Sequence, residues 1–354
     1  MTEAVLNLKE REEKLVAPKD FPTISIHKLS GLNIERAKEI VKPMIYEGSS
    51  MEVYAPSGIG KTWFMLELCI SIASGKKFLD RFEIINPRPV FYIDGEMKIE
   101  NMQDRINKII RRHGINCKIP EGYFELSNPY THPDKVIPKV NHPETIRSIK
   151  EKVKQMQEAT GQPIFLVIDN LSCLTDNKEN DGDDYIPILD MYTHLKTQNH
   201  SICHVHHANK SGTGSRGSSR RHDALDTIIK LSKPNDYEES DGANFNVSFE
   251  KHRNFAGEHA YPFNAKIDPD DQLNLVRWKI TEFKDKIEED LLAEWCANSP
   301  NITIDKVAEK VKISSSNAQR LLQKMRSNGK YEREMIERWG SEWQKHCKWH
   351  GKAK

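Results

Sequence analysis

The chain has 354 residues, of which 37% are hydrophobic and 30% are charged, and its formal net charge is +1. This composition is typical of a globular protein and excludes an intrinsically disordered chain. No apolar run approaches the roughly 18–20 residues of a membrane span, residues 1–20 are too charged for a targeting peptide, and the six scattered cysteines lack a CxxC pair. We therefore expect a reducing, cytoplasmic location without disulfides, structural zinc or contact with a membrane.

The predicted elements alternate between apolar strands and amphipathic helices after a polar arm at residues 1–34. A short helix is expected at 34–45, and residues 115–145 are rich in proline and receive no assignment. The predicted strands are 50–55, 90–94, 164–169, 202–207, 226–231, 245–251 and 273–278, and helices are expected to end near residues 74, 113, 160 and 197. Such alternation favours an α/β core at 35–282, with a mostly parallel sheet that is covered on both faces.

The pattern changes after residue 283. Apolar residues recur at helical spacing in three short segments near 287–295, 304–311 and 318–325. Three short amphipathic helices are typical of a helix-turn-helix or winged-helix module. We therefore expect a small α-helical domain at 283–354 that carries a basic tail.

A phosphate-binding loop follows the first predicted strand. The sequence fits the P-loop pattern GxxxxGK[ST], with alanine in the first glycine position. Small residues let successive backbone amides surround phosphate oxygens, and the start of the next helix adds partial positive charge. The lysine would add a full charge and the threonine would ligate Mg²⁺, so we expect ATP and Mg²⁺ here rather than an ordinary glycine-rich turn. The nucleotide-binding residues are Ala55, Pro56, Ser57, Gly58, Ile59, Gly60, Lys61 and Thr62.

Two carboxylates are expected to complete the chemistry of this loop. Asp169 ends an entirely apolar strand, which is the Walker B pattern, and it would hold Mg²⁺ together with Thr62. Glu96 follows the second strand and would polarise the attacking water, although Asp94 could compete for this role. Both carboxylates would lie at the carboxyl ends of strands, where open α/β sheets bind ligands.

Two histidines end the fourth predicted strand. A group at this position commonly senses the γ-phosphate, and we expect His207 rather than His206 to do so. A pair of histidines could alternatively bind a metal or cap the strand.

Together these residues resemble the RecA/DnaB superfamily of hexameric ATPases, which includes KaiC-like and RecA-like AAA proteins. The likeness is carried by Glu96, the Walker B strand, the His-His-x-x-Lys-Ser-Gly run at 206–212 and the Lys-His-Arg-Asn run at 251–254. Among these proteins, the pattern looks most like the RepA-type plasmid replicative helicases. The resemblance implies a RecA-like core and assembly with other copies of the chain, most often as a hexamer.

The same resemblance implies that Lys251 and Arg253 reach the γ-phosphate of a neighbouring subunit, with Arg253 as an arginine finger. An independent argument agrees, because a guanidinium from a neighbour stabilises charge that spreads over the γ-phosphate oxygens. Arg220 and Arg221 could supply the finger instead. All five residues Glu96, Asp169, His207, Lys251 and Arg253 are therefore candidate catalytic residues.

Two basic regions are candidates for DNA binding. From Lys306 to the end there are 13 Lys and Arg against 5 Asp and Glu. A recognition helix there would present Asn317, Arg320 and Lys324 to phosphates or base edges, although a protein-binding surface is the alternative. The second region is a Gly- and Ser-rich loop with Lys210, Arg216, Arg220 and Arg221. It could hold single-stranded DNA in a ring channel, or it could be a switch loop ordered by ATP.

We therefore interpret the sequence as an ATPase, with a replicative DNA helicase of a plasmid, phage or mobile element as the leading hypothesis. The alternative is an ATP-dependent DNA-binding regulator that does not unwind DNA. A small-molecule kinase on a P-loop core is a further rival, but it leaves the basic C-terminal region without a role.

Overall fold

The computed structural model describes residues 22–176, 185–208, 219–234, 237–238, 241–282, 303–310 and 314–320. The chain divides into two compact units, Met1–Ala37 and Lys38–Lys354. The described part of the first unit contains one short helix, α2 (Ile26–Ser30), and none of its residues is buried. The Ser25 side chain caps this helix by accepting a hydrogen bond from the Lys28 amide at 3.3 Å.

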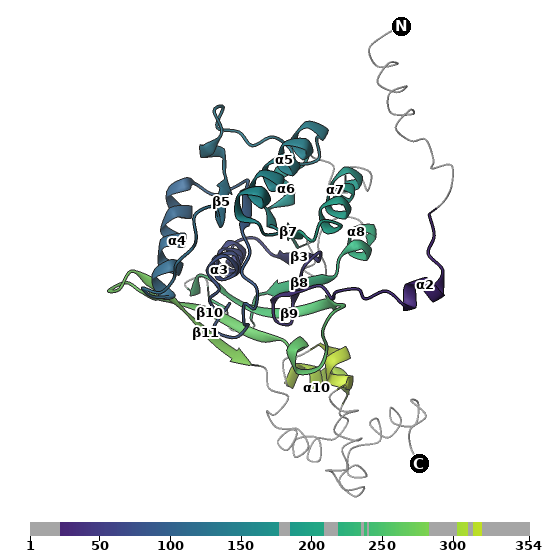
Figure 1. The fold of residues 1–354 in the computed structure, drawn as a ribbon. Helices are drawn as coiled ribbons and strands as arrows, with labels where there is room; N and C mark the ends of the chain where they lie inside the picture. Colours follow the sequence, from purple (N-terminus) through teal and green to yellow (C-terminus); the bar gives the residue numbers. More distant parts are fainter. Residues whose placement is uncertain are drawn as a thin grey trace, which may run out of the picture. The chain divides into compact units, whose positions relative to one another are not determined.

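A nine-stranded sheet organises the second unit, in the order β11-β10-β9-β8-β3-β7-β6-β4-β5 (Figure 1). The six strands from β8 to β5 run parallel, whereas β9, β10 and β11 are antiparallel to their neighbours. The strands are β3 (Ser50–Ala55), β4 (Val90–Asp94), β5 (Phe124–Ser127), β6 (Phe165–Asp169), β7 (Ser201–His207), β8 (Thr227–Ser232), β9 (Asn244–His252), β10 (Phe263–Asp270) and β11 (Leu275–Glu282). The prediction of an α/β fold with a mostly parallel sheet is confirmed.

Helices cover both faces of the parallel part of the sheet. Side chains alternate between the faces of a strand, so Phe165 and Val167 of β6 join one core while Leu166 and Ile168 join the other. The first core includes α3 (Lys61–Ser74) and α4 (Ile99–Arg112), and the second includes α5 (Pro143–Thr160), α6 (Leu171–Leu174) and α7 (Ile186–Lys196). Burial on both faces explains why β4 and β6 are nearly continuous apolar runs.

The helix expected at residues 34–45 is wrong. This segment instead forms two short antiparallel strands, β1 (Glu39–Val41) and β2 (Ile45–Tyr46). Ile40 and Val41 are β-branched and fully buried, which favours a strand, and Pro43 cannot continue a helix. The remaining short elements are the 3₁₀ turns η1 (Pro129–Thr131) and η4 (Gly257–Ala260) and the helix α8 (Ser219–Ala224).

Two further strands were not expected from the sequence. β5 lies at the edge of the sheet within the proline-rich segment, and β10 precedes β11. The strand expected at 273–278 corresponds to β11, which begins two residues later, and Leu273 lies in the exposed turn before it.

Only short parts of the expected C-terminal module are described. They are α10 (Ile304–Lys310) and a helical segment at 315–320, in which Val307, Ala308 and Ala318 are buried. Ser314 caps the second segment by accepting from the Asn317 amide at 3.3 Å. The helix expected near 287–295 lies outside the described residues, and the domain limits at 34 and 283 stay predictions. Within the described ranges, no helix is both long and apolar enough to cross a bilayer.

Candidate nucleotide site

The candidate site lies at the carboxyl ends of four adjacent strands, β3, β7, β6 and β4. Ala55 at the end of β3 is in register with His207 at the end of β7. Asp169 at the end of β6 is in register with Asp94 at the end of β4. The fold therefore gathers four segments that are far apart in the sequence at the sheet edge where parallel α/β proteins bind ligands.

The loop between β3 and α3 depends on glycine. Gly58 and Gly60 have φ angles of +82° and +100°, which lie in the left-handed region. A Cβ atom on Gly60 would lie 2.4 Å from the Ala243 Cβ atom and 2.9 Å from its Cα atom. Only glycine fits at this position, and the loop then leads directly into the N-terminus of α3, whose free amides favour an anion.

Lys61 is the first residue of α3, and its side chain turns back into the loop. Its ammonium group donates to the Pro56 carbonyl at 3.2 Å and lies 3.2 Å from His207 Nδ1. Burial lowers the pKa of Lys61, and the nearby carboxylates of Asp169 and Glu96 oppose this shift. A buried cation whose acceptor is a neutral carbonyl fits the phosphate oxygens of a nucleotide.

Asp169 provides a buried carboxylate beside the loop. The Tyr92 hydroxyl donates to its Oδ2 atom at 2.5 Å. Burial raises the pKa of Asp169, whereas Tyr92 and Lys61 lower it. Mg²⁺ is usually held in proteins by one or two carboxylates together with waters and phosphate oxygens. Asp169 and the Thr62 hydroxyl, in the first turn of α3, fit this requirement.

Asp94 and Glu96 have different environments. Asp94 is buried and accepts from the Met97 amide at 3.0 Å and from Asn128 Nδ2 at 2.6 Å. Burial and the charge of Asp169 raise the pKa of Asp94 to about 6. These contacts occupy its carboxylate in shaping the turn after β4, which leaves Asp94 poorly placed to orient a water.

Glu96 projects from the same turn, and its side chain is 51% exposed. One of its oxygens accepts from the Cys173 thiol at 3.0 Å and lies 3.8 Å from His207 Nε2. The His207 contact is the main reason that the pKa of Glu96 falls to about 2. Glu96 is therefore ionised at neutral pH and open to solvent, as a residue that polarises water must be.

His207 contacts the P-loop, the segment after β6 and Glu96. Its ring lies 3.2 Å from both Ser57 Oγ and Lys61 Nζ, and 3.3 Å from Asn170 Nδ2. His206, its neighbour in β7, is fully buried on the other face of the sheet, where it contacts the Tyr185 hydroxyl at 3.1 Å. The geometry therefore favours His207 over His206 for sensing a bound phosphate.

Three residues near the site were not predicted, namely Tyr92, Asn170 and Cys173. Asn170 caps α6 by accepting from the Cys173 amide at 3.1 Å, and α6 then carries the Cys173 thiol to Glu96. Asn170 follows Asp169 directly in the sequence, and an Asn at this position before a short apolar segment is a helix-capping signal. Tyr92 gives no such signal, because its polar atom is one of several in a buried strand.

Lys251 and Arg253 lie at the other end of the sheet. The amino end of β8 is in register with Met51 near the start of β3, and His252 of β9 pairs with Thr227. The length of β3 separates these two edges by about 17 Å at 3.3 Å per residue. The fold therefore does not bring Lys251 or Arg253 to the P-loop of the same chain.

The remaining candidate residues are described only in part. Lys210, Arg216 and Lys324 lie outside the described residues. Arg220 and Arg221 belong to α8, but their side chains are not described. In the segment 315–320, Asn317 is half-buried and Arg320 is exposed. Their roles in DNA binding, and the choice between Arg253 and the pair in α8 as the finger, stay predictions.

A family model for an AAA domain matches residues 15–213, which is more than half of the chain and includes the P-loop, Glu96, Asp169 and His207. The chain belongs to this AAA domain family. No curated protein matches the sequence. Among solved structures, the chain is similar to a KaiC-like protein from the hyperthermophilic archaeon Pyrococcus horikoshii OT3, with 15% identity and a TM-score of 0.46 over 68% of this chain and 93% of that chain. Family membership and the P-loop at the carboxyl edge of the sheet identify this AAA domain protein as a P-loop ATPase.

Proposed function

We propose that this AAA domain protein is a ring-forming ATPase that hydrolyses ATP at sites shared between two copies of the chain, and that it uses the turnover to move on DNA as a replicative helicase. One observation carries the proposal of a shared site. The P-loop lies at the carboxyl edge of the sheet, whereas the candidate cations Lys251 and Arg253 lie at the amino edge. A second copy is needed to bring the two edges together.

Each residue has a defined role in this proposal. The loop amides and Lys61 bind the triphosphate, while Thr62 and Asp169 hold Mg²⁺, which neutralises charge on the phosphate oxygens when bound. Glu96 orients and polarises the attacking water. The His207 ring lies 3.2 Å from Lys61 Nζ and 3.8 Å from a Glu96 oxygen. A phosphate bound at Lys61 can therefore shift His207 and, through it, the Glu96 carboxylate that acts on water. Arg253 of a second copy stabilises the negative charge of the transition state.

Action on DNA is the further part of the proposal. Its support is the basic balance of the residues from Lys306 onward and the capped helical segment that carries Asn317 and Arg320. The same features favour a second candidate function, an ATP-dependent DNA-binding regulator. Both candidates share the ATPase chemistry, so the first experiment concerns turnover alone.

ATP turnover should depend on residues at both edges of the sheet. Lys61→Ala should abolish turnover by removing the charge within the loop. Arg253→Ala should lower kcat roughly a thousandfold and leave binding of a fluorescent ATP analogue intact, because the loop of the same chain is unchanged. Mixing the two inactive variants should restore turnover, since an Arg253→Ala subunit keeps its P-loop and can be completed by a Lys61→Ala neighbour.

Arg277→Ala is the matched control, because Arg277 is also an exposed arginine, near the start of the outer strand β11. It should turn over ATP at the wild-type rate. Unchanged turnover in Lys61→Ala would contradict the nucleotide site. A loss in Arg253→Ala that is not recovered in mixtures would contradict the shared site.

A further inference from the structure

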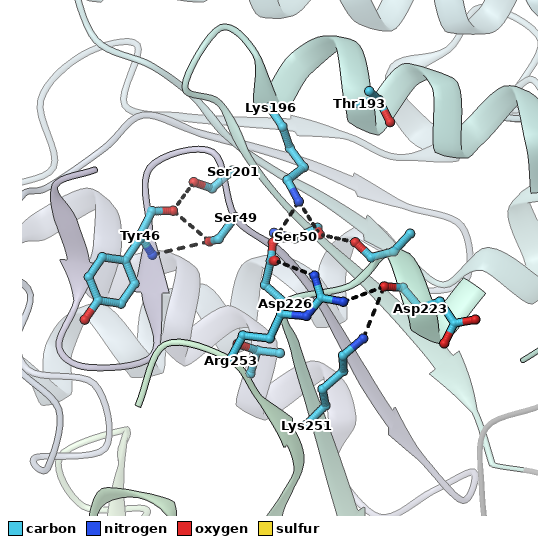
Figure 2. A network of polar contacts seen from close by, with 12 residues as sticks. Tyr46, Ser49, Ser50, Thr193, Lys196, Ser201, Asp223, Asp226, Lys251 and Arg253 are labelled. Carbon is cyan, nitrogen blue, oxygen red and sulfur yellow. Dashed lines mark hydrogen bonds and ion pairs between the residues drawn. The ribbon is translucent and has the colours of Figure 1, made fainter. Parts of the chain in front are cut away.

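A second cluster of charged side chains lies at the amino edge of the sheet, where β3, β8, β9 and the end of α7 meet (Figure 2). Lys196 ends α7, Asp226 comes just before β8, and Arg253 comes just after β9. Ser50, the first residue of β3, lies among them. The family resemblance suggests no role for Lys196 or Asp226.

Asp226 is held firmly in this cluster. Its amide donates to the Ser50 carbonyl at 2.9 Å, and its Oδ2 atom accepts from the Ser50 amide at 2.9 Å and from Lys196 Nζ at 2.8 Å. Burial alone would raise the pKa of Asp226, but the donors from Lys196 and Ser50 outweigh burial and the pKa lies below its ordinary value. The carboxylate is thus a fixed anion at neutral pH.

Arg253 is held much less firmly than Asp226. Its amide donates to the Asp226 carbonyl at 3.1 Å, and its guanidinium donates to the Asp223 carbonyl at 2.8 Å. The guanidinium is 3.6 Å from Asp226 Oδ1, and the Arg253 side chain is 52% exposed, against 17% for Asp226. Five N–H donors on a half-exposed guanidinium leave room for a further anion.

Lys251 donates to the same backbone carbonyl as Arg253, that of Asp223. Its ammonium donates to the carbonyl oxygens of His222 and Asp223 at the end of α8. Burial and the neighbouring charge of Arg253 lower the pKa of Lys251. Three cations, Lys196, Lys251 and Arg253, therefore share two nearby carboxylates, Asp223 and Asp226, and Lys196 is the cation closest to Asp226. An additional anion such as a phosphate would balance the excess of positive charge.

We propose that Asp226 is a positioning residue, which holds the Arg253 guanidinium toward the phosphates of a nucleotide bound by a second copy of the chain, and that Lys196 keeps Asp226 from closing onto Arg253. The inference rests on the proposed function, because it assumes that Arg253 acts in a neighbour's site. Lys196 donates a hydrogen bond to Asp226 Oδ2 and so offsets part of the carboxylate's charge. Asp226 can then orient the Arg253 guanidinium without forming a close ion pair that would neutralise it.

Asp226→Asn tests the positioning role with little change in volume. The amide oxygen can still accept from the Ser50 amide, but the charge that orients Arg253 is lost. Because small misplacements of an acting group are costly, kcat for ATP should fall roughly ten- to hundredfold, while KM for ATP stays unchanged. Asp270→Asn is the matched control, since Asp270 pairs with Arg277 at 3.2 Å elsewhere on the sheet, and it should keep the wild-type kcat.

Two measurements separate positioning from a general structural effect. In an Arg253→Ala background, Asp226→Asn should cause no further loss of kcat, because the two residues act through one guanidinium. Mixing Asp226→Asn with Lys61→Ala subunits should restore turnover, because the intact Arg253 and Asp226 of the second variant complete the P-loop of the first. A structural defect predicts additive losses and no recovery in the mixture, and that result would overturn the inference.

Failure of this inference can be distinguished from failure of the proposed function. Wild-type turnover in Arg253→Ala would overturn the proposed function itself. Loss of turnover in Arg253→Ala together with wild-type turnover in Asp226→Asn would overturn only the positioning role. If Asp226→Asn does not fold, Lys196→Gln takes its place. The freed carboxylate should then pair closely with Arg253 and lower kcat without changing KM, and a wild-type kcat would overturn the inference.

Discussion

Gly60 shows how a single residue joins the nucleotide loop to the rest of the sheet. Its φ angle of +100° turns the loop, and its missing side chain lets the backbone approach Ala243, which precedes β9. The P-loop pattern therefore needs glycine here both for the positive φ angle and for the close approach to Ala243, and only the first of these needs can be inferred from the sequence pattern. Contact with Ala243 also links the loop to the strand that ends near Lys251 and Arg253.

Gly60→Ala should destabilise the protein more than Gly58→Ala. Both glycines have positive φ angles, so alanine costs about 1–2 kcal/mol of backbone strain at either position. No atom lies within 4 Å of a Cβ on Gly58, whereas a Cβ on Gly60 meets Ala243 at 2.4 Å. This clash should add roughly 1–3 kcal/mol to the loss in the free energy of unfolding, measured with urea. Equal losses in the two variants would show that the contact with Ala243 relaxes freely.

At the scale of elements, the sequence predicts well those strands that are buried on both faces. β4 and β6 are apolar runs with an aspartate at the carboxyl end, and that pattern identifies both the strand and its site residue. The edge strand β5 and the outer strand β10 give weaker signals, because β5 has four half-buried residues and no buried one, while β10 alternates apolar and polar residues and contains Pro269. β1 and β2 were mistaken for a helix, since apolar residues on both sides of Pro43 match either structure over so short a segment.

The polar contacts between side chains of the site are the feature that the sequence predicts least well. Asp169 and His207 were predicted from their places at strand ends, yet the contacts of Tyr92 with Asp169 and of Cys173 with Glu96 depend on register and on the position of α6. The cluster around Asp226 was missed for the same reason, because Lys196, Asp226 and Arg253 carry no local motif.

His200 joins two elements and should make the stability depend on pH. Its Nδ1 atom accepts from the Ile164 amide at 2.9 Å, and burial lowers its pKa to about 4 from an ordinary 6.5. Between these values the unfolded chain binds a proton that the folded chain does not, so stability falls as the pH drops through the window. From pH 7.5 to pH 5 this effect should remove about 2 kcal/mol.

His200→Asn should remove that contribution, because the Asn oxygen can accept from the Ile164 amide but does not titrate. The check is the difference between the free energies of urea unfolding at pH 7.5 and pH 5, for the wild type and the variant. His259→Asn replaces an exposed histidine and serves as the control, with the wild-type dependence expected. An unchanged pH dependence in His200→Asn would contradict the assignment.

At the scale of the whole molecule, the proposed function requires the two edges of one sheet to act as complementary surfaces. The carboxyl edge has the P-loop and Glu96, and the amino edge has Lys251 and Arg253. Contact between different surfaces of identical subunits is heterologous, and it forms a ring if the rotation closes and an open filament if it does not. A metabolite kinase, which works as a monomer or dimer, has no need of this arrangement.

Assembly should therefore require both nucleotide and Arg253. Sedimentation velocity with a non-hydrolysable ATP analogue should show a closed oligomer for the wild type, and electron microscopy with single-stranded DNA should show a ring with DNA in its channel. Arg253→Glu should reduce assembly by placing like charge opposite the phosphates, whereas Arg277→Glu should not. An open filament, or wild-type assembly of the Arg253→Glu variant, would contradict the ring.

Strand displacement on a forked duplex then decides between the two candidate functions that share this chemistry. A helicase should displace the strand at a rate that falls with ATP turnover in Lys61→Ala, Arg253→Ala and Asp226→Asn, because movement is driven by the shared site. A regulator should hydrolyse ATP and bind the duplex without displacing a strand. Strand displacement that persists in Lys61→Ala would show that unwinding does not depend on ATP turnover at the P-loop. The shared site would then not drive movement along DNA.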